Sequence, residues 1–196
     1  DPYWHQPVPP ERAGDWFLTL GREQYEWLKS TLERSKARYK FVFAHNLIGG
    51  AEMNGLMRGG VSAARNLEWG GYNLDGTWGF DVARPGWGKP IHQLLVDNKA
   101  TIFFHGHDHL YAREELDGVV YQEGPMPGSR NATPVARNRY RYTGTVLGGT
   151  GYLRVHVAPE GVKVDFVQTW LPQQETAQLR NGVVADSYTI KGRQAP

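Results

Sequence analysis

The 196-residue chain has no cysteine, which excludes disulfide bonds and thiolate metal ligands. It also lacks any apolar run as long as a membrane-spanning helix, so no membrane span is expected. No stretch resembles a secretory or transit peptide, and because the chain begins at Asp1 we expect a processed or excised piece. The net charge of +2 gives no argument for a nucleic-acid or anionic-membrane partner.

The remaining composition is that of a globular protein. Hydrophobic residues make up 40% and charged residues 21%, which is enough for one domain with a sizeable core. Seven Trp, ten Tyr, 24 Gly and 12 Pro predict long, aromatic-lined loops. This composition favours an exported protein, periplasmic or extracellular.

The pattern of apolar residues predicts an α/β chain with mixed sheets and flanking helices. A helix is expected over 21–38, where apolar residues recur at nearly helical spacing. Shorter runs predict strands at 39–44, 101–104 and 119–122, a helix at 90–98, and a hairpin of 152–157 and 162–170. Because strand–helix–strand crossovers are right-handed, the strands at 39–44 and 101–104 are expected to be parallel and adjacent or nearly so.

The chain is expected to form one partial domain over residues 1–196. Residues 1–14 are rich in proline and aromatics and predict an extended surface arm. Residues 47–88 contain many Gly and Trp with little periodicity, which predicts a long loop or insertion outside the core. Residues 171–196 are expected to form a tail. Residues 131–133 fit the N-glycosylation pattern, which is common by chance.

A cluster of histidines follows the predicted strand at 101–104. Three of the seven histidines lie within five residues, in the order His105-Gly106-His107-Asp108-His109. Neutral imidazole donates a lone pair to transition metals, and several convergent nitrogens are what chelation requires. The alternative is a solvated polar turn; the number of imidazoles favours a metal site.

His45 is expected to join this cluster. It ends the predicted strand at 39–44, and the carboxyl ends of parallel strands lie at one edge of a sheet. The topology therefore brings His45, His107 and His109 towards one site. His105 is left out, because Gly106 is expected to break the extended backbone that would align it with His107.

The segment Phe103–Arg113 resembles the region around the Gly-His-x-His signature of calcineurin-like metallophosphoesterases, the superfamily that includes purple acid phosphatases. Residues 24–28 and 40–45 resemble the helix and strand that carry the preceding histidine ligand, and residues 146–151 with the hairpin resemble the last strands. The resemblance covers roughly residues 15 to 170. It implies the second half of the family's four-layer αββα fold.

The resemblance also implies a site and a reaction. Two divalent or trivalent ions (Zn, Fe, Mn or Ni) would lie close together, with His45 and His107 on one ion and His109 on the other. Asp108, Tyr111 and Arg113 are expected around these ligands rather than among them: Asp108 either orients one ligand or faces solvent, and Tyr111 and Arg113 pack and pair under the loop. The reaction would be hydrolysis of phosphate mono- or diesters.

Several features of the family are missing from this sequence. There are no Asp-x-His, Gly-Asp-x-x-Asp or Gly-Asn-His-Glu/Asp segments, and Asn46 stands where many members have a second histidine. The bridging aspartate is therefore absent, and no catalytic acid can be assigned. We expect the isolated chain to be inactive, and to need a missing amino-terminal half or another chain.

Two other functions fit parts of the sequence. Residues 105–109 are one residue short of the His-x-His-x-Asp-His signature of metallo-β-lactamase-like hydrolases. Alternatively, the chain is a non-catalytic binding module with an incidental histidine cluster. In that case four aromatic residues are candidates for stacking on a sugar or a partner: Trp69, Tyr72, Trp78 and Trp87.

Overall fold

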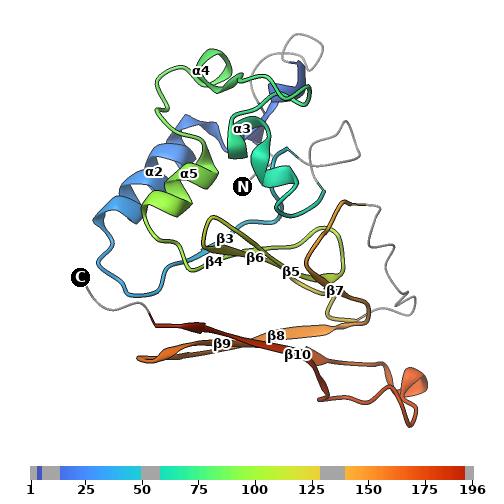
Figure 1. The fold of residues 1–196 in the computed structure, drawn as a ribbon. Coiled ribbons are helices and arrows are strands. Elements are labelled where there is room, and N and C mark those ends of the chain that lie inside the picture. Colours follow the sequence, from blue (N-terminus) through green and yellow to red (C-terminus); the bar gives the residue numbers. More distant parts are fainter. Residues whose placement is uncertain (1–3, 6–13, 50–57, 129–139, 193–196) are drawn as a thin grey trace.

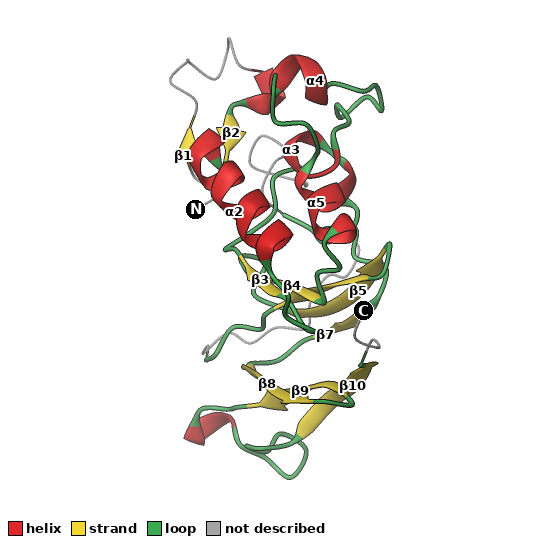
Figure 2. Cartoon of the chain, turned by 90° about the vertical axis from the view of Figure 1, so that its left-hand side faces the viewer, coloured by secondary structure: helices red, strands yellow, loops and turns green. Residues whose placement is uncertain are grey.

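The computed structural model describes residues 4–5, 14–49, 58–128 and 140–192. These residues form three layers, with helices on one face of a five-stranded sheet and a three-stranded sheet on the other (Figures 1 and 2). The predicted α/β class, with mixed sheet and flanking helices, is confirmed. Within the described residues, no helix is long and apolar enough to cross a membrane.

The five-stranded sheet has the order β3-β4-β6-β5-β7. Its strands are β3 (Phe41–Phe43), β4 (Ile102–His105), β5 (Tyr111–Leu116), β6 (Val119–Glu123) and β7 (Thr145–Leu147). β3 pairs in parallel with β4, and β4 pairs in parallel with β6, whereas β5 is antiparallel to both of its neighbours. The predicted parallel pairing of the two histidine-bearing strands is therefore confirmed.

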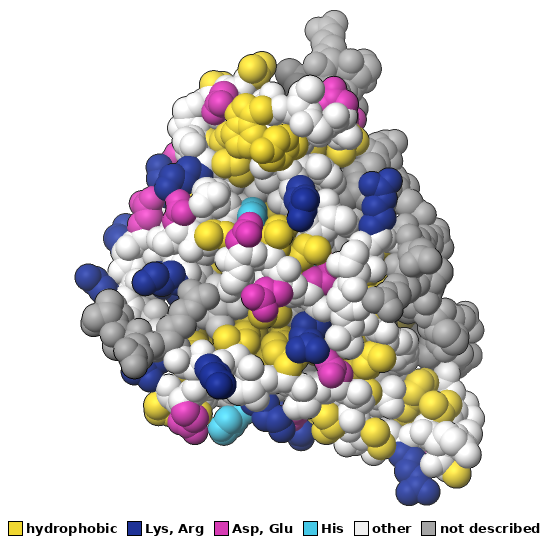
Figure 3. Space-filling view, viewed as in Figure 1, with side chains coloured by type: hydrophobic (Ala, Val, Ile, Leu, Met, Phe, Trp, Pro, Cys, Tyr) yellow, Lys and Arg dark blue, Asp and Glu magenta, His cyan; other side chains and the backbone are white. Residues whose placement is uncertain are grey.

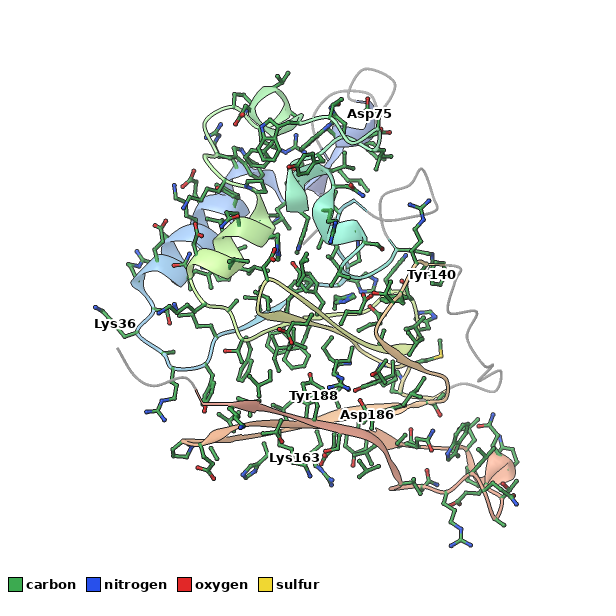
Figure 4. All side chains as sticks on the ribbon, viewed as in Figure 1. Lys36, Asp75, Tyr140, Lys163, Asp186 and Tyr188 are labelled. Atoms are coloured by element: carbon green, nitrogen blue, oxygen red, sulfur yellow. The ribbon has the colours of Figure 1, made fainter. Side chains whose placement is uncertain are left out.

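The three-stranded sheet is antiparallel, in the order β10-β9-β8. β8 (Gly151–Ala158) and β9 (Gly161–Gln168) form the predicted hairpin. β10 (Val184–Lys191) lies in the segment expected to be a tail and forms the third strand. The two sheets pack through a buried apolar layer that comprises Ile102, Phe104, Val120, Val162, Val164 and Tyr188. Figure 4 shows Tyr188 directed from β10 towards the five-stranded sheet.

Helices cover the other face of the five-stranded sheet (Figure 2). They are α2 (Gly21–Arg34), α3 (Leu67–Gly70), α4 (Phe80–Ala83) and α5 (Ile91–Asp97), with 3-10 turns η1 (Gly14–Trp16), η2 (Ala63–Arg65) and η3 (Pro172–Gln174) elsewhere. α2 buries Tyr25, Leu28 and Leu32, as its periodicity predicts. It ends before residue 38 because Ser35 is extended, while its N–H still bonds to the last turn.

The described part of the segment 47–88 belongs to the core, so the expectation of a loop outside the core is wrong there. In its described part, Leu47, Ile48, Trp69, Phe80 and Trp87 are all at most 4% exposed. Short helical turns separated by glycines bring these side chains onto the sheet without a long periodic pattern. Trp69 and Trp87 are therefore core residues and are not available to stack on a ligand.

Little of the predicted arm is described. β1 (Trp4–His5) pairs with β2 (Leu18–Thr19), and the rest of residues 1–13 lies outside the described residues. The glycosylation pattern at 131–133 also lies outside them.

Candidate metal-binding site

Backbone hydrogen bonds hold the ends of β3 and β4 together. The Ala44 N–H donates to the carbonyl of Phe104 (3.1 Å), and the Gly106 N–H donates to the carbonyl of His45 (2.8 Å). His45 thus follows one strand and His107 the next, at the same edge of the sheet. This edge is the ligand-binding edge of open α/β sheets.

The two imidazoles meet, as predicted. His45 Nε2 lies 3.0 Å from His107 Nδ1, and the rings are nearly perpendicular at 77°. Burial lowers the pKa of His107, which favours the neutral ring near neutral pH. His107 has φ = 86°, a left-handed conformation that costs about 1–3 kcal/mol in a non-glycine residue and is concentrated at functional sites.

His109 does not complete a three-histidine group. It is exposed and, like His107, has a positive φ (58°). Among the described residues there is no group of three or more His, Cys, Asp or Glu side chains arranged to hold a metal ion. The structure therefore brings together two of the three predicted ligands.

The carboxylate of Asp108 is part of the loop scaffold. Its side chain is 1% exposed and lies 2.9 Å from Nη1 of Arg58. It also accepts hydrogen bonds from the N–H of Gly59 (2.8 Å) and the hydroxyl of Tyr142 (2.8 Å). Arg58 in turn donates to the carbonyl of His107 (3.3 Å). Asp108 thus holds the backbone of the histidine loop, and its oxygens are already engaged.

His105 makes a contact that the sequence did not reveal. Its Nδ1 lies 2.6 Å from Oε2 of Glu123 on β6, and both side chains are almost fully buried. Burial raises the pKa of Glu123, whose other oxygen accepts the N–H of Asp108 (3.0 Å). Because His105 is paired inside the sheet, it does not share a site with His107. A His-x-His chelate of the metallo-β-lactamase type is therefore disfavoured.

Tyr111 and Arg113 connect the two sheets. The Tyr111 hydroxyl donates to Asp186 of β10 (2.5 Å), and its ring stacks on Phe166. Arg113 Nε lies 3.5 Å from Asp186, and its guanidinium covers the ring of Tyr188. Figure 4 shows Asp186 and Tyr188 between the layers. Within the described part of the chain, these contacts serve sheet packing rather than the histidine pair.

The described residues fit a metal ion in part. Two imidazole nitrogens 3.0 Å apart are close enough to share one ion, since metal–nitrogen bonds are about 2.0–2.1 Å long. The side-chain oxygen of Asn46 is buried and has no hydrogen-bond partner among the described residues, so one oxygen next to His45 is uncommitted. No carboxylate of the described residues joins the pair, so the described part of the chain provides an incomplete donor set.

A groove between the two sheets borders His45 of the histidine pair. It has a volume of about 680 Å³ and is lined by His45 together with Phe43, Phe104, Tyr152 and Val155. Phe43 is 72% exposed and Tyr152 49% exposed. Both residues lie on edge strands of their sheets, β3 and β8. The groove beside the histidine pair is thus open on the side of these two edge strands.

Comparisons with known proteins identify the fold. No family model and no curated protein matches the sequence. Solved structures do match: GAP50, described as the anchor in the inner membrane complex of Plasmodium, has a TM-score of 0.53 and 13% identity over 88% of this chain and 43% of its own. PhoD has a TM-score of 0.51 and 13% identity over 96% of this chain and 36% of its own.

A purple acid phosphatase from yellow lupin seeds has a TM-score of 0.49 and 16% identity over 88% of this chain and 28% of its own. The chain thus spans less than half the length of each of these proteins. At such identities the likeness concerns the fold alone, and it covers nearly all of this chain. The fold of this chain is metallophosphoesterase-like.

Proposed function

We propose that this chain is the carboxyl-terminal part of a metal-dependent phosphoesterase that hydrolyses phosphate mono- or diesters. The observation that carries the proposal is the contact between His45 and His107, at the carboxyl ends of two adjacent parallel strands. The metallophosphoesterase-like fold supports it. In the complete domain His45 and His107 would bind one ion, and His109 would bind a second.

The ions would polarise the phosphoryl oxygens and lower the pKa of a bound water. The contribution of this chain is to position the histidine side chains for metal binding. The hydrogen bond from Gly106 to His45 fixes the two strand ends, and the lowered pKa of His107 keeps that ring neutral. Zn, Fe, Mn and Ni all suit imidazole ligands, so the donor set does not select among them.

The isolated chain should hydrolyse phosphate esters poorly or not at all. Two-metal catalysis needs ions about 3.5–4 Å apart, which requires a bridging carboxylate and further ligands. Asp108 does not serve as the bridge, because its oxygens bind Arg58, Gly59 and Tyr142. We propose that a polypeptide that covers the exposed edge strands β3 and β8 supplies the missing metal ligands. It would be the amino-terminal half of the domain or another chain.

Zinc binding by the chain tests the histidine pair. The chain should bind zinc, and His107→Ala should weaken binding at least tenfold in calorimetry, because one of two convergent nitrogens is lost. His156→Ala, an exposed histidine on β8, is the matched control and should bind like the unmodified chain. Unchanged zinc affinity in His107→Ala would contradict the proposed site.

Hydrolysis tests the need for a partner. The chain is assayed with Mn or Zn on chromogenic phosphate mono- and diesters, alone and within its full-length parent protein. We expect turnover only in the parent protein, and loss of that turnover in His107→Ala. Robust turnover by the purified monomer, abolished in His107→Ala, would show that no further half is required.

A second candidate function is a non-catalytic binding module. Two observations favour it: the described residues hold no complete metal group, and the carboxylate beside the histidines is locked in the loop. A fold of this kind also occurs in GAP50, which is described as an anchor. A full-length protein that folds but shows no metal-dependent hydrolysis would favour this function over the first.

A further inference from the structure

A second cavity of about 720 Å³ lies at the opposite edge of the five-stranded sheet from the histidine pair. Its wall includes Asp117, in the turn that precedes β6. β6 runs parallel to β4, and His107 follows the carboxyl end of β4. Asp117 is therefore at the amino-terminal edge and His107 at the carboxyl-terminal edge. The volume is typical of small-molecule sites, which measure about 300–1,000 Å³.

Two partly exposed aromatic side chains line this cavity. Trp78 is 48% exposed and Tyr72 46% exposed, with ring centroids 5.2 Å apart and ring planes at 82°. Figure 3 shows hydrophobic side chains gathered on this face over the region of α3 and α4. Large aromatic surfaces left in water beside a cavity are characteristic of binding sites, because covering them is favourable.

The turn that carries these aromatics is held rigidly. The Trp16 indole donates to Asn73 (2.8 Å), and Asn73 donates to the hydroxyl of Thr77 (3.0 Å). Asp75, labelled at the tip of this turn in Figure 4, accepts the N–H of Thr77 (2.9 Å). The Trp78 indole donates to Asp81 (2.7 Å). A platform fixed in this way loses little conformational entropy when a ligand binds.

Glycine is required where the platform meets α3. Gly71 has φ = 92°, and a Cβ at this position would lie 2.3 Å from the ring of Trp78. The indole thus packs directly against the backbone of residue 71. The Gly71 N–H also bonds to the carbonyl of Leu67, so the platform is continuous with the short helix α3.

Polar side chains of both hydrogen-bonding types complete the wall of the cavity. Asn66 and Gln93 offer amide oxygens, because their NH₂ groups donate to the carbonyl of Gly49 (3.0 Å) and to Asp97 (2.6 Å). Asp117 offers a carboxylate and Arg65 a guanidinium. The side chain of Arg65 is exposed and makes no hydrogen bond or ion pair with any described residue. Asp117 contacts His92 (3.0 Å), yet its side chain stays 65% exposed. One cationic and one anionic side chain offset each other, so the wall carries no strong charge.

We propose that this cavity binds a neutral carbohydrate. The apolar C–H face of a pyranose ring would lie on Trp78 and its edge would meet Tyr72, whose ring plane is at 82° to that of Trp78, so that the sugar replaces water on both aromatic surfaces. Sugar hydroxyls both donate and accept hydrogen bonds, which matches the mixture of amide, carboxylate and guanidinium groups. A phosphorylated ligand would require a net positive wall, and a wholly apolar ligand would leave the polar groups unpaired. The proposal is independent of the metal site.

The test is an NMR titration of the chain with four neutral oligosaccharides: cellohexaose, maltohexaose, xylohexaose and chitohexaose. We expect at least one of them to bind with a millimolar or lower Kd and to shift the indole N–H signal of Trp78. Trp78→Ala should weaken that binding about tenfold or more. Trp27→Ala removes a tryptophan that is 65% exposed on α2, outside the cavity, and should leave the affinity unchanged.

A second variant separates loss of binding from loss of folding. Gln93 is exposed on α5, so Gln93→Ala should fold normally, as thermal unfolding would verify, and still weaken binding several-fold. The proposal is overturned if none of the four sugars shifts the Trp78 signal, or if Trp27→Ala weakens binding as much as Trp78→Ala. Tighter binding of adenosine monophosphate than of any sugar would also overturn it.

Discussion

Asp108 stands between two histidines, but its hydrogen bonds go to the scaffold beneath them. Three donors from Arg58, Gly59 and Tyr142 surround a carboxylate whose side chain is 1% exposed. Burial of a carboxylate is costly unless such donors are present, and each donor is itself left unpaired when the carboxylate is changed. The buried carboxylate of Asp108 therefore stabilises the conformation of the histidine loop.

Replacing this carboxylate by an amide should destabilise the chain. In Asp108→Asn, one oxygen becomes an NH₂ group that faces existing donors. We expect a loss of about 2–3 kcal/mol in the free energy of unfolding, below the range for a fully buried pair because Arg58 is 23% exposed. Urea unfolding measures it, with the exposed Glu115→Gln as control. Equal stability of the two variants would contradict the scaffold role.

Single-residue predictions from the sequence succeeded where they depended on strand ends. His45 and His107 were placed together because two apolar strands stop just before them, and the 3.0 Å contact agrees. The pairing of His105 with Glu123 was not predictable, because it joins side chains on two neighbouring strands inside the sheet. The exposure of His109 depends on a loop with positive φ angles, which no periodic pattern reveals.

At the scale of elements, Asp165 joins all three strands of the smaller sheet. It lies on β9 and accepts hydrogen bonds from Arg154 of β8 (2.8 Å) and Ser187 of β10 (2.7 Å). Lys163 lies 3.1 Å away on the same strand, and Figure 4 shows this lysine directed away from the five-stranded sheet. The hydrogen bond from Ser187, followed by those from Arg154 and Lys163, lowers the pKa of Asp165.

This lowered pKa predicts how stability depends on pH. A carboxyl whose folded-state pKa lies below its unfolded value, about 3.9, stabilises the fold above that value. The contribution is lost as the pH falls through the folded-state pKa. Asp165→Asn should therefore be less stable at pH 7, by about 1 kcal/mol, and the difference should shrink below about pH 4. Urea unfolding across pH measures this, and exposed Glu160→Gln serves as control. A difference independent of pH would contradict it.

Strands with a clear apolar or alternating pattern were predicted, among them the hairpin of β8 and β9, whereas two strands rich in polar residues were not. The strands at 102–105 and 119–123 are buried and begin with apolar runs, and both were expected. β5 and β10 carry charged residues, such as Glu115 and Asp186, and were not predicted. Their place depends on cross-strand pairing with β6 and β9, which the local sequence does not encode.

At the scale of the molecule, the layers are covered unequally. Helices protect one face of the five-stranded sheet and the smaller sheet protects the other (Figure 2). The edge strands β3 and β8, however, carry apolar side chains with large exposed fractions: Phe43 72%, Tyr152 49%, Val155 38% and Val157 50%. The α/β class was predictable from the order of elements, but the packing of one sheet on the other was not, because it depends on contacts distant in sequence.

This exposure predicts self-association of the isolated chain. An edge strand with a large exposed aromatic side chain can pair with a strand of another chain. A charged side chain on the edge strand is a common way in which proteins prevent such pairing. Phe43→Lys should therefore shift the chain towards the monomer in sedimentation velocity over a series of concentrations. Phe43 contributes little to the core, since it is 72% exposed and its ring stacks on Phe104 with the centroids 4.9 Å apart. The substitution should therefore change the free energy of unfolding by less than about 1 kcal/mol. Trp27→Lys places the same charge on exposed α2 and should leave association unchanged. If both variants associate equally, the contact surface lies elsewhere, and a partner that completes the histidine site would have to approach by a route other than β3.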